Sequence, residues 1–185
     1  DNRFVVAATL AGQTSWKVEL KAAALSAPAL ADVARDGKLK VVVGDANGSV
    51  TSIDAATGKK EWERAISPWR AISAGVSVTD VDGDGADDVI VGSESGELVA
   101  LKGKDGAPLW SAKKPGAIWA APMLVDLDGG GHREVLAAWS EGNVAVLDHK
   151  TGKELWGTRV EHDDGTPATL LAAPMPVPGP RIGYM

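Results

Sequence analysis

Cysteine is absent from this 185-residue chain, and tryptophan is its only frequent aromatic residue. Without cysteine there is no disulfide framework, no thiolate metal site and no cysteine nucleophile. The net charge is −6 and no basic run occurs, which argues against nucleic-acid and anionic-membrane partners. No apolar stretch reaches the roughly 18–20 residues that a membrane-spanning helix needs. The remaining class is a globular protein, and 22 glycines and ten prolines favour many short strands joined by turns.

The chain repeats one motif. The segments "VTSIDAATGKKEW", "LVALKGKDGAPLW", "VAVLDHKTGKELW" and "VVAATLAGQTSW" each contain an apolar strand, a glycine turn and a tryptophan four residues after the glycine. The pairs are Gly12/Trp16, Gly58/Trp62, Gly106/Trp110 and Gly152/Trp156, with glycine spacings of 46, 48 and 46 residues. Upstream of three of these pairs lie a second apolar strand and a hairpin glycine (Gly48, Gly96 and Gly142). One unit is therefore four short strands in about 46 residues, which is the length and strand count of a propeller blade.

The predicted fold class is all-β, a β-propeller of four-stranded antiparallel blades in one domain, 1–185. We expect blade A at 21–64, blade B at 70–112 and blade C at 117–160, and residues 168–185 to share a fourth blade with residues 1–20. Such sharing would remove the open sheet edges of a linear array. The alternative is half of an eight-bladed ring, completed as a homodimer by a second copy or by further sequence.

The four repeated tryptophans predict packing between blades, because a large ring at the end of an outer strand covers the gap to the next blade. These repeats resemble the tryptophan-docking repeat of PQQ-type, quinoprotein-like propellers, a family of quinone-dependent dehydrogenases and of non-enzymatic scaffolds. "DVDGDGADDVIVG" resembles the FG-GAP/VCBS repeat of integrin-like propellers. Together the resemblances cover nearly the whole chain, and they imply the fold more strongly than an activity.

An acidic loop at residues 80–88 is a candidate calcium site. Its predicted ligands are the side chains of Asp80, Asp82, Asp84 and Asp88 and the backbone carbonyl of Ala86. A short loop that converges several oxygens suits a hard cation, and no histidine or cysteine is interleaved to favour zinc. The FG-GAP resemblance implies Ca²⁺ as well. A carboxylate pair for glycoside hydrolysis is disfavoured, because a local loop leaves no room for a sugar between the acids.

The sister loops carry incomplete ligand sets. Asp126, Asp128 and Glu134 form a weaker candidate metal site, with Gly130 at the fifth position. The first loop has Lys40 at the ninth position, where its positive charge would oppose a metal ion, so we expect that loop to be empty. These loops lie on the same face as the glycine turns, away from the usual ligand mouth.

On the opposite face, Trp69 and Trp139 are not explained by the repeat and are candidates for a ligand surface. Trp119 aligns with Leu25, Ile72 and Leu171, which predicts core packing. Linker residues that could add polar contacts are Arg70, His162, Asp163 and Asp164.

The leading hypothesis is a non-catalytic, calcium-containing propeller that binds protein or carbohydrate partners. By resemblance it would be extracellular, periplasmic or on the cell surface, and the chain shows no signal peptide. The alternatives are an accessory domain of a quinoprotein-like or polysaccharide-acting enzyme, and a repeat fragment with no selected ligand. No quinone-holding residues or Ser/His/Asp arrangement can be identified, so we do not expect an enzyme.

Overall fold

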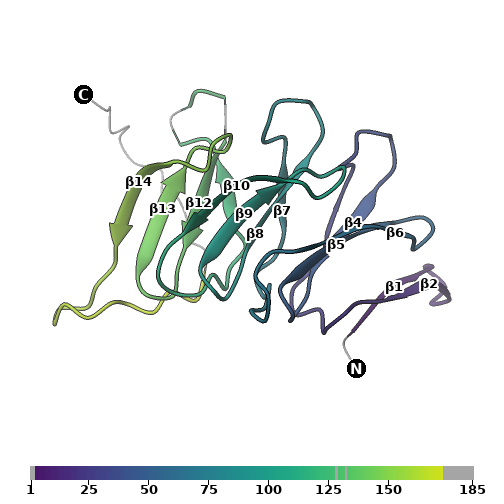
Figure 1. The fold of residues 1–185 in the computed structure, drawn as a ribbon, viewed down its shortest axis with the longest axis horizontal. Helices are drawn as coiled ribbons and strands as arrows, with labels where there is room; N and C mark the ends of the chain where they lie inside the picture. The colour runs from purple at the N-terminus through teal and green to yellow at the C-terminus, as the bar shows by residue number, and fades with distance from the viewer. Residues whose placement is uncertain (1–2, 128, 132, 173–185) are drawn as a thin grey trace.

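Three four-stranded antiparallel sheets and one two-stranded sheet follow one another along the chain (Figure 1). The computed structural model describes residues 3–127, 129–131 and 133–172. The first sheet pairs β1 (Phe4–Ala8) with β2 (Thr14–Glu19). Blade A contains β3 (Ala29–Ala31), β4 (Lys40–Gly44), β5 (Ser49–Asp54) and β6 (Lys60–Ala65). Blade B contains β7 (Ser77–Thr79), β8 (Asp88–Gly92), β9 (Glu97–Leu101) and β10 (Pro108–Lys113). Blade C contains β11 (Met123–Val125), β12 (Glu134–Ala138), β13 (Asn143–Leu147) and β14 (Glu154–Arg159).

Each blade is a meander in which every strand pairs with the next one in the chain. The second strands are apolar runs without alternation, and β8 and β12 are buried along their whole length. A strand inside a stack of sheets is covered on both faces, so it reads as a continuous apolar run. The fold class predicted from the sequence is confirmed: an all-β propeller of four-stranded blades. No helix that could span a membrane occurs among the described residues.

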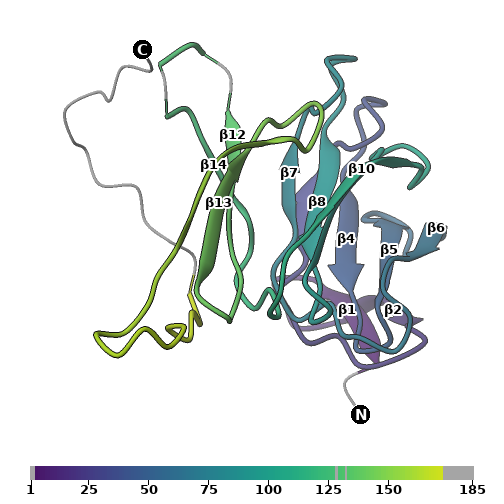
Figure 2. The same ribbon diagram turned by 60° about the vertical axis from the view of Figure 1, so that its left-hand side comes forward.

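Two edges of the stack differ in what they carry (Figures 1 and 2). The loops that join the first and second strands of each blade project from one edge, which we call the loop edge: residues 32–39, 80–87 and the described residues of 126–133. The segments that join one sheet to the next lie at the opposite edge, which we call the linker edge: residues 20–28, 66–76 and 114–122.

Tryptophan docking joins each sheet to the next, as the repeat predicts. The side chains of Trp16, Trp62 and Trp110 lie against the glycine turn of the following blade so closely that a Cβ on that glycine would be 2.6–2.8 Å from the indole. Each Nε1–H donates to a carbonyl in the same turn: Ala55 at 2.9 Å, Gly103 at 2.8 Å and His149 at 2.6 Å. The turn glycines Gly58, Gly106 and Gly152 are therefore required for close approach as well as for their positive φ.

The two ends of the stack lie on opposite sides of the described structure (Figures 1 and 2). The sheet of β1 and β2 is at one end and blade C is at the other, with blades A and B between them. Trp156, which was expected to pack between blades, is instead 46% exposed because no described sheet follows blade C. Most of the segment expected to share a blade with residues 1–20 lies outside the described residues, so ring closure stays a prediction.

Candidate functional site

The acidic loop of blade B brings three of its carboxylates together. Asp80 follows β7 and Asp88 opens β8, so the ends of two paired strands fix both residues. Carboxylate oxygens of Asp80, Asp82 and Asp88 all lie within 4.8 Å of one another. The side chain of Asp84, the fourth predicted ligand, lies outside this group and accepts a hydrogen bond from the N–H of Ala86 at 2.8 Å.

The first aspartate of the loop also shapes the backbone. Asp80 accepts from the N–H groups of Gly83 at 2.7 Å and Gly85 at 2.9 Å, one with each carboxylate oxygen. The same two-oxygen pattern recurs at Asp32 in blade A and at Asp126 in blade C. This position therefore stabilises the loop in all three blades, whether or not a loop holds a metal ion.

The ninth position supplies a buried carboxylate. Asp88 is only 2% exposed and accepts hydrogen bonds from the N–H groups of Val81 and Gly103, both at 3.0 Å. Burial raises the pKa of Asp88 above its ordinary value, although these two N–H groups oppose the rise. A bound cation would favour the charged form and offset this effect of burial.

Two basic side chains already lie beside the loop. Lys102 Nζ is 2.9 Å from Asp82 Oδ2, and this hydrogen bond is the main cause that lowers the pKa of Asp82. Arg35 reaches across from the loop of blade A, and its Nη1 donates to the carbonyl of Asp84 at 2.7 Å. Carboxylates this close together repel one another unless a cation neutralises them. Lys102 and Arg35 supply part of this neutralising charge, which is a second reason why the acidic residues can lie close together.

In blade A a lysine occupies the ninth position and is fully buried. Lys40 Nζ lies 3.2 Å from Asp36 Oδ2, 3.7 Å from Glu61 Oε2 and 3.8 Å from Asp54 Oδ2. Burial by itself lowers the pKa of Lys40, but the hydrogen bond to Asp36 and the nearby carboxylates outweigh it and raise the pKa. An ammonium group thus stands where blade B has a carboxylate, which fits the expectation that this loop holds no metal.

Blade C contains the weaker candidate metal site, of which the structure describes Asp126 and Glu134. Glu134 is buried and its Oε2 accepts from the N–H of Leu127 at 2.9 Å, as Asp88 accepts from Val81. Both oxygens of Asp126 are engaged by backbone N–H groups, and Asp128 lies outside the described residues. Metal binding here stays a prediction.

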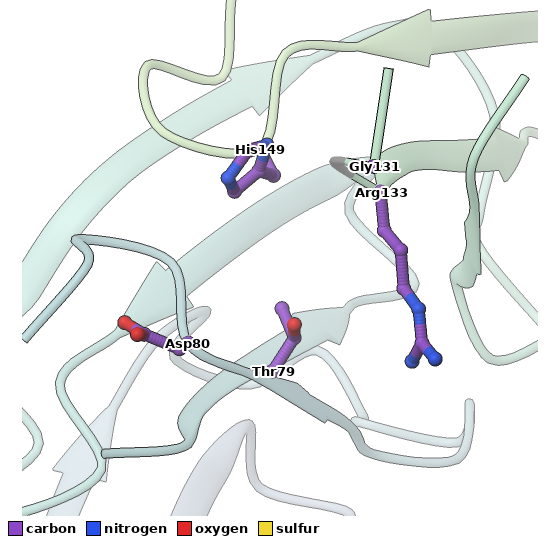
Figure 3. Close-up of a pocket in the computed structure, with 5 residues that line it drawn as sticks. All are labelled: Thr79, Asp80, Gly131, Arg133 and His149. Atoms are coloured by element: carbon purple, nitrogen blue, oxygen red, sulfur yellow. The ribbon is translucent and has the colours of Figure 1, made fainter. Parts of the chain in front are cut away.

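A small polar cavity of about 210 Å³ separates the loops of blades B and C (Figure 3). Asp80 and Thr79 form one wall, His149 faces them, and Arg133 borders the side. Sequence reasoning missed this grouping, because its members come from three separate turns. It lies at the loop edge beside the candidate metal loop.

At the linker edge, Trp69 is exposed as predicted, at 84%. Its φ is +67°, an unfavourable value for a bulky residue. Among the described non-glycine residues, only Arg35 shares a positive φ with Trp69. The polar residues expected beside it, Arg70 and 162–164, are also exposed.

Trp139 was predicted as part of the ligand surface, and that prediction is wrong. The side chain is 0% exposed, and its Nε1–H donates to the carbonyl of Gly96 in blade B at 2.8 Å. Its counterparts Asp45 and Ser93 are buried too, which shows that this hairpin position faces the neighbouring blade. Trp139 is a core residue of the contact between blades B and C.

The core prediction for Trp119 is also wrong, by one residue. Ile118 is fully buried and packs on Gly92, as Ile72 packs on Gly44, whereas Trp119 is 41% exposed. The linker of blade A is two residues longer than that of blade B, and this difference shifts the alignment. Exposed apolar side chains at the linker edge therefore comprise Leu25, Trp69, Trp119 and Leu171.

These sheets define a β-propeller whose blades are joined by docked tryptophans. A family model confirms this class: the chain belongs to the family described as outer membrane protein assembly factor BamB, whose model matches residues 1–169. No curated protein matches the sequence. The match supports the PQQ-type part of the resemblance, and the FG-GAP/VCBS part stays a prediction.

Solved structures show the same fold at low identity. BamB from Moraxella catarrhalis is 23% identical with a TM-score of 0.66, over 88% of this chain and 46% of that chain. The computationally designed Ika8 protein is 20% identical with a TM-score of 0.65, over 90% and 44%. Quinohemoprotein alcohol dehydrogenase from Comamonas testosteroni is 16% identical with a TM-score of 0.63, over 91% and 35%. The chain spans less than half of each of these structures.

Proposed function

We propose that this chain is a non-catalytic scaffold that binds a protein partner through its linker edge. The observation that carries the proposal is Trp69, which is highly exposed and held at a positive φ by the surrounding linker. Backbone strain of this kind persists at binding sites because the surrounding structure enforces it. Exposed tryptophan is also the residue type most enriched among the energetic centres of protein interfaces.

The surroundings of Trp69 support this assignment. Its N–H donates to the carbonyl of Asn47 in the β4–β5 hairpin at 3.3 Å, and the N–H of Arg70 donates to the carbonyl of Ser67 at 2.9 Å. These bonds hold the linker in place while the indole remains in solvent. Trp119 adds a second exposed indole in the next linker at the same edge. A rigid aromatic anchor beside further apolar surface is typical of a protein-docking site.

The family description names an assembly factor for outer membrane proteins, and we extend a role in protein assembly to this chain as part of the proposal. A periplasmic or cell-surface location would accompany that role. Carbohydrate partners and an enzymatic accessory role are the competing assignments. The polar cavity beside Asp80, His149 and Arg133 is the feature on which a catalytic or sugar-binding role would depend.

Site-specific photocrosslinking in cells of the source organism tests the proposal. A photoreactive amino acid at Arg70, beside the intact Trp69, should give discrete protein adducts, whereas the same group at Lys104, in the β9–β10 turn on the opposite side of the blade, should give none. Adducts from both positions alike, or from neither, would contradict a partner site at the linker edge. Trp69→Ala should then remove the adducts formed by a photoreactive group placed at Arg70.

We also propose that the acidic loop of blade B binds Ca²⁺. The clustered oxygens of Asp80, Asp82 and Asp88 suit a hard cation, and binding would displace Lys102 from Asp82. The role would be local stabilisation, because the loop of blade A folds with a lysine in the equivalent place.

A further inference from the structure

Each contact that joins two sheets pairs a tryptophan with a glycine turn. At one end of the described structure such a tryptophan is exposed, and at the other end such a turn is uncovered. Inside the stack, three tryptophans each cover the glycine turn of the next sheet. The fourth tryptophan of the repeat, Trp156, lies on β14, whose residues are all exposed, whereas the docked tryptophans of β2, β6 and β10 are half-buried or buried. No described carbonyl accepts a hydrogen bond from its indole. Leu155 and Val160 extend the apolar surface around it and are also exposed.

The opposite end presents the complementary surface. Gly12 occupies the turn of the first sheet with a φ of +78°, and no described atom lies within 4 Å of the position where its Cβ would be. Every other turn glycine of this type has an indole there. Leu10 at the tip of the turn and Val6 on β1 are exposed. This end therefore has a bare glycine and apolar surface where the internal turns hold a tryptophan.

We propose that Trp156 docks on the Gly12 turn of a second copy of this chain, head to tail. The two surfaces lie at opposite ends of the stack, so a second copy can meet either one without any change in the arrangement of the sheets (Figures 1 and 2). The contact joins two different patches, so it is heterologous, and two copies that close a ring would use it twice.

The proposal relies on the packing of the ring over glycine, and it does not require the internal hydrogen bond. The turn at Gly12 is one residue shorter than its counterparts: the N–H of Thr9 donates to Gln13, four residues on, whereas that of Asp54 donates to Lys59, five residues on. The internal turns therefore do not indicate which carbonyl would accept a hydrogen bond from the indole of Trp156. Gly12 retains the positive φ, the absence of a side chain and the four-residue spacing to the next tryptophan.

Sedimentation equilibrium of the purified chain across a range of concentrations tests the proposal. We expect wild-type chain to show the mass of two copies, and Trp156→Ala to raise the dissociation constant of the pair by roughly thirtyfold or more, as for a central interface tryptophan. Leu30→Ala removes an exposed apolar side chain from β3 of blade A, inside the stack, and should leave the mass unchanged. A single-copy mass for the wild type, or a Trp156→Ala variant that still pairs normally, would overturn the proposal.

A mixing experiment separates head-to-tail pairing from a symmetric contact. Leu10→Arg places a charge at the exposed tip of the receiving turn, where it cannot disturb the core, and should also yield single copies. When Trp156→Ala and Leu10→Arg chains are mixed, one intact tryptophan can meet one intact turn, so a pair of weakened affinity should return. A mixture that remains single copies would overturn the head-to-tail geometry.

Discussion

The loops at 32–40 and 80–88 carry opposite charges at their ninth position. Asp32 and Asp80 each accept two backbone N–H groups of their own loop, from Asp36 and Gly37 in blade A and from Gly83 and Gly85 in blade B. Blade A then buries the ammonium of Lys40 against carboxylates, whereas blade B buries the carboxylate of Asp88 beside Asp82 and Lys102. In both blades the buried charge at this position has hydrogen-bond or ion-pair partners, and only the carboxylate of blade B has oxygen atoms that could ligate a cation.

The largest effect should come from removal of the buried ammonium. Lys40→Met should lower the free energy of unfolding by about 3 kcal/mol, because it leaves Asp54, Glu61 and Asp36 without their shared cation. This value is at the lower end for a broken buried ion pair, since the carboxylates of Asp36 and Glu61 retain contact with water. Urea unfolding followed by tryptophan fluorescence measures the loss.

Lys102→Met is the matched control for that variant. It removes the same type of charge from the loop of blade B, but Lys102 is substantially exposed, so little change in stability is expected. If both variants lost the same free energy of unfolding, the buried lysine would contribute no more to stability than the exposed one, which would contradict the prediction.

Calcium should have the next largest effect, and chiefly through blade B. With a dissociation constant typical of extracellular calcium modules, about 0.1–1 mM, 10 mM Ca²⁺ should raise the free energy of unfolding by about 1.4–2.7 kcal/mol relative to EDTA. Asp82→Ala should abolish this gain, and Asp84→Ala should weaken it less, because the Asp84 carboxylate lies outside the group of three. Asp87→Ala is the control and should leave the gain intact. A transition that is the same in calcium and EDTA would remove the calcium proposal.

The sequence specified the shape of these loops better than their electrostatics. Repetition exposed the positions of the turn glycines and of the docking tryptophans, because each is fixed by contacts that recur in every unit. Arg35 and Lys102 were not anticipated as partners of the acidic loop. Arg35 comes from the loop of the neighbouring blade and Lys102 from the β9–β10 turn, and no local spacing connects either residue to the acidic loop.

The errors at Trp139 and Trp119 have a related cause. Trp139 is a single departure from small or polar counterparts, and the repeat alone does not reveal that its position faces the next blade. Trp119 was misplaced because linkers of unequal length shift the alignment by one residue. Such insertions are tolerated in surface segments, so periodicity is least informative where a binding surface is expected.

A smaller effect should follow from the arginine that connects the two loops. Arg35→Gly removes the hydrogen bond to the carbonyl of Asp84, and it also relieves the strain of a non-glycine residue at a φ of +51°. These changes oppose each other in stability. The loss of one cation beside the acidic loop should raise its calcium affinity about twofold, since exposed charges interact weakly in water. Isothermal titration of Ca²⁺ into both chains measures this, and a lower affinity in Arg35→Gly would show that Arg35 positions the ligands.

The smallest effect concerns acid stability in blade A. The hydroxyl and the N–H of Thr57 hold the pKa of Asp54 below its ordinary value of 3.8, with Lys40 a lesser cause. The charged form is thus favoured in the folded state, so its contribution is present above the unfolded pKa and is lost as the pH falls through the folded pKa. Asp54→Asn should therefore flatten the fall in stability below about pH 4, as measured by urea unfolding at a series of pH values. Because Thr57 is the main cause, the same flattening should persist in the Lys40→Met background. If the flattening disappeared in the Lys40→Met background, the buried ammonium, and not the turn, would control the pKa of Asp54.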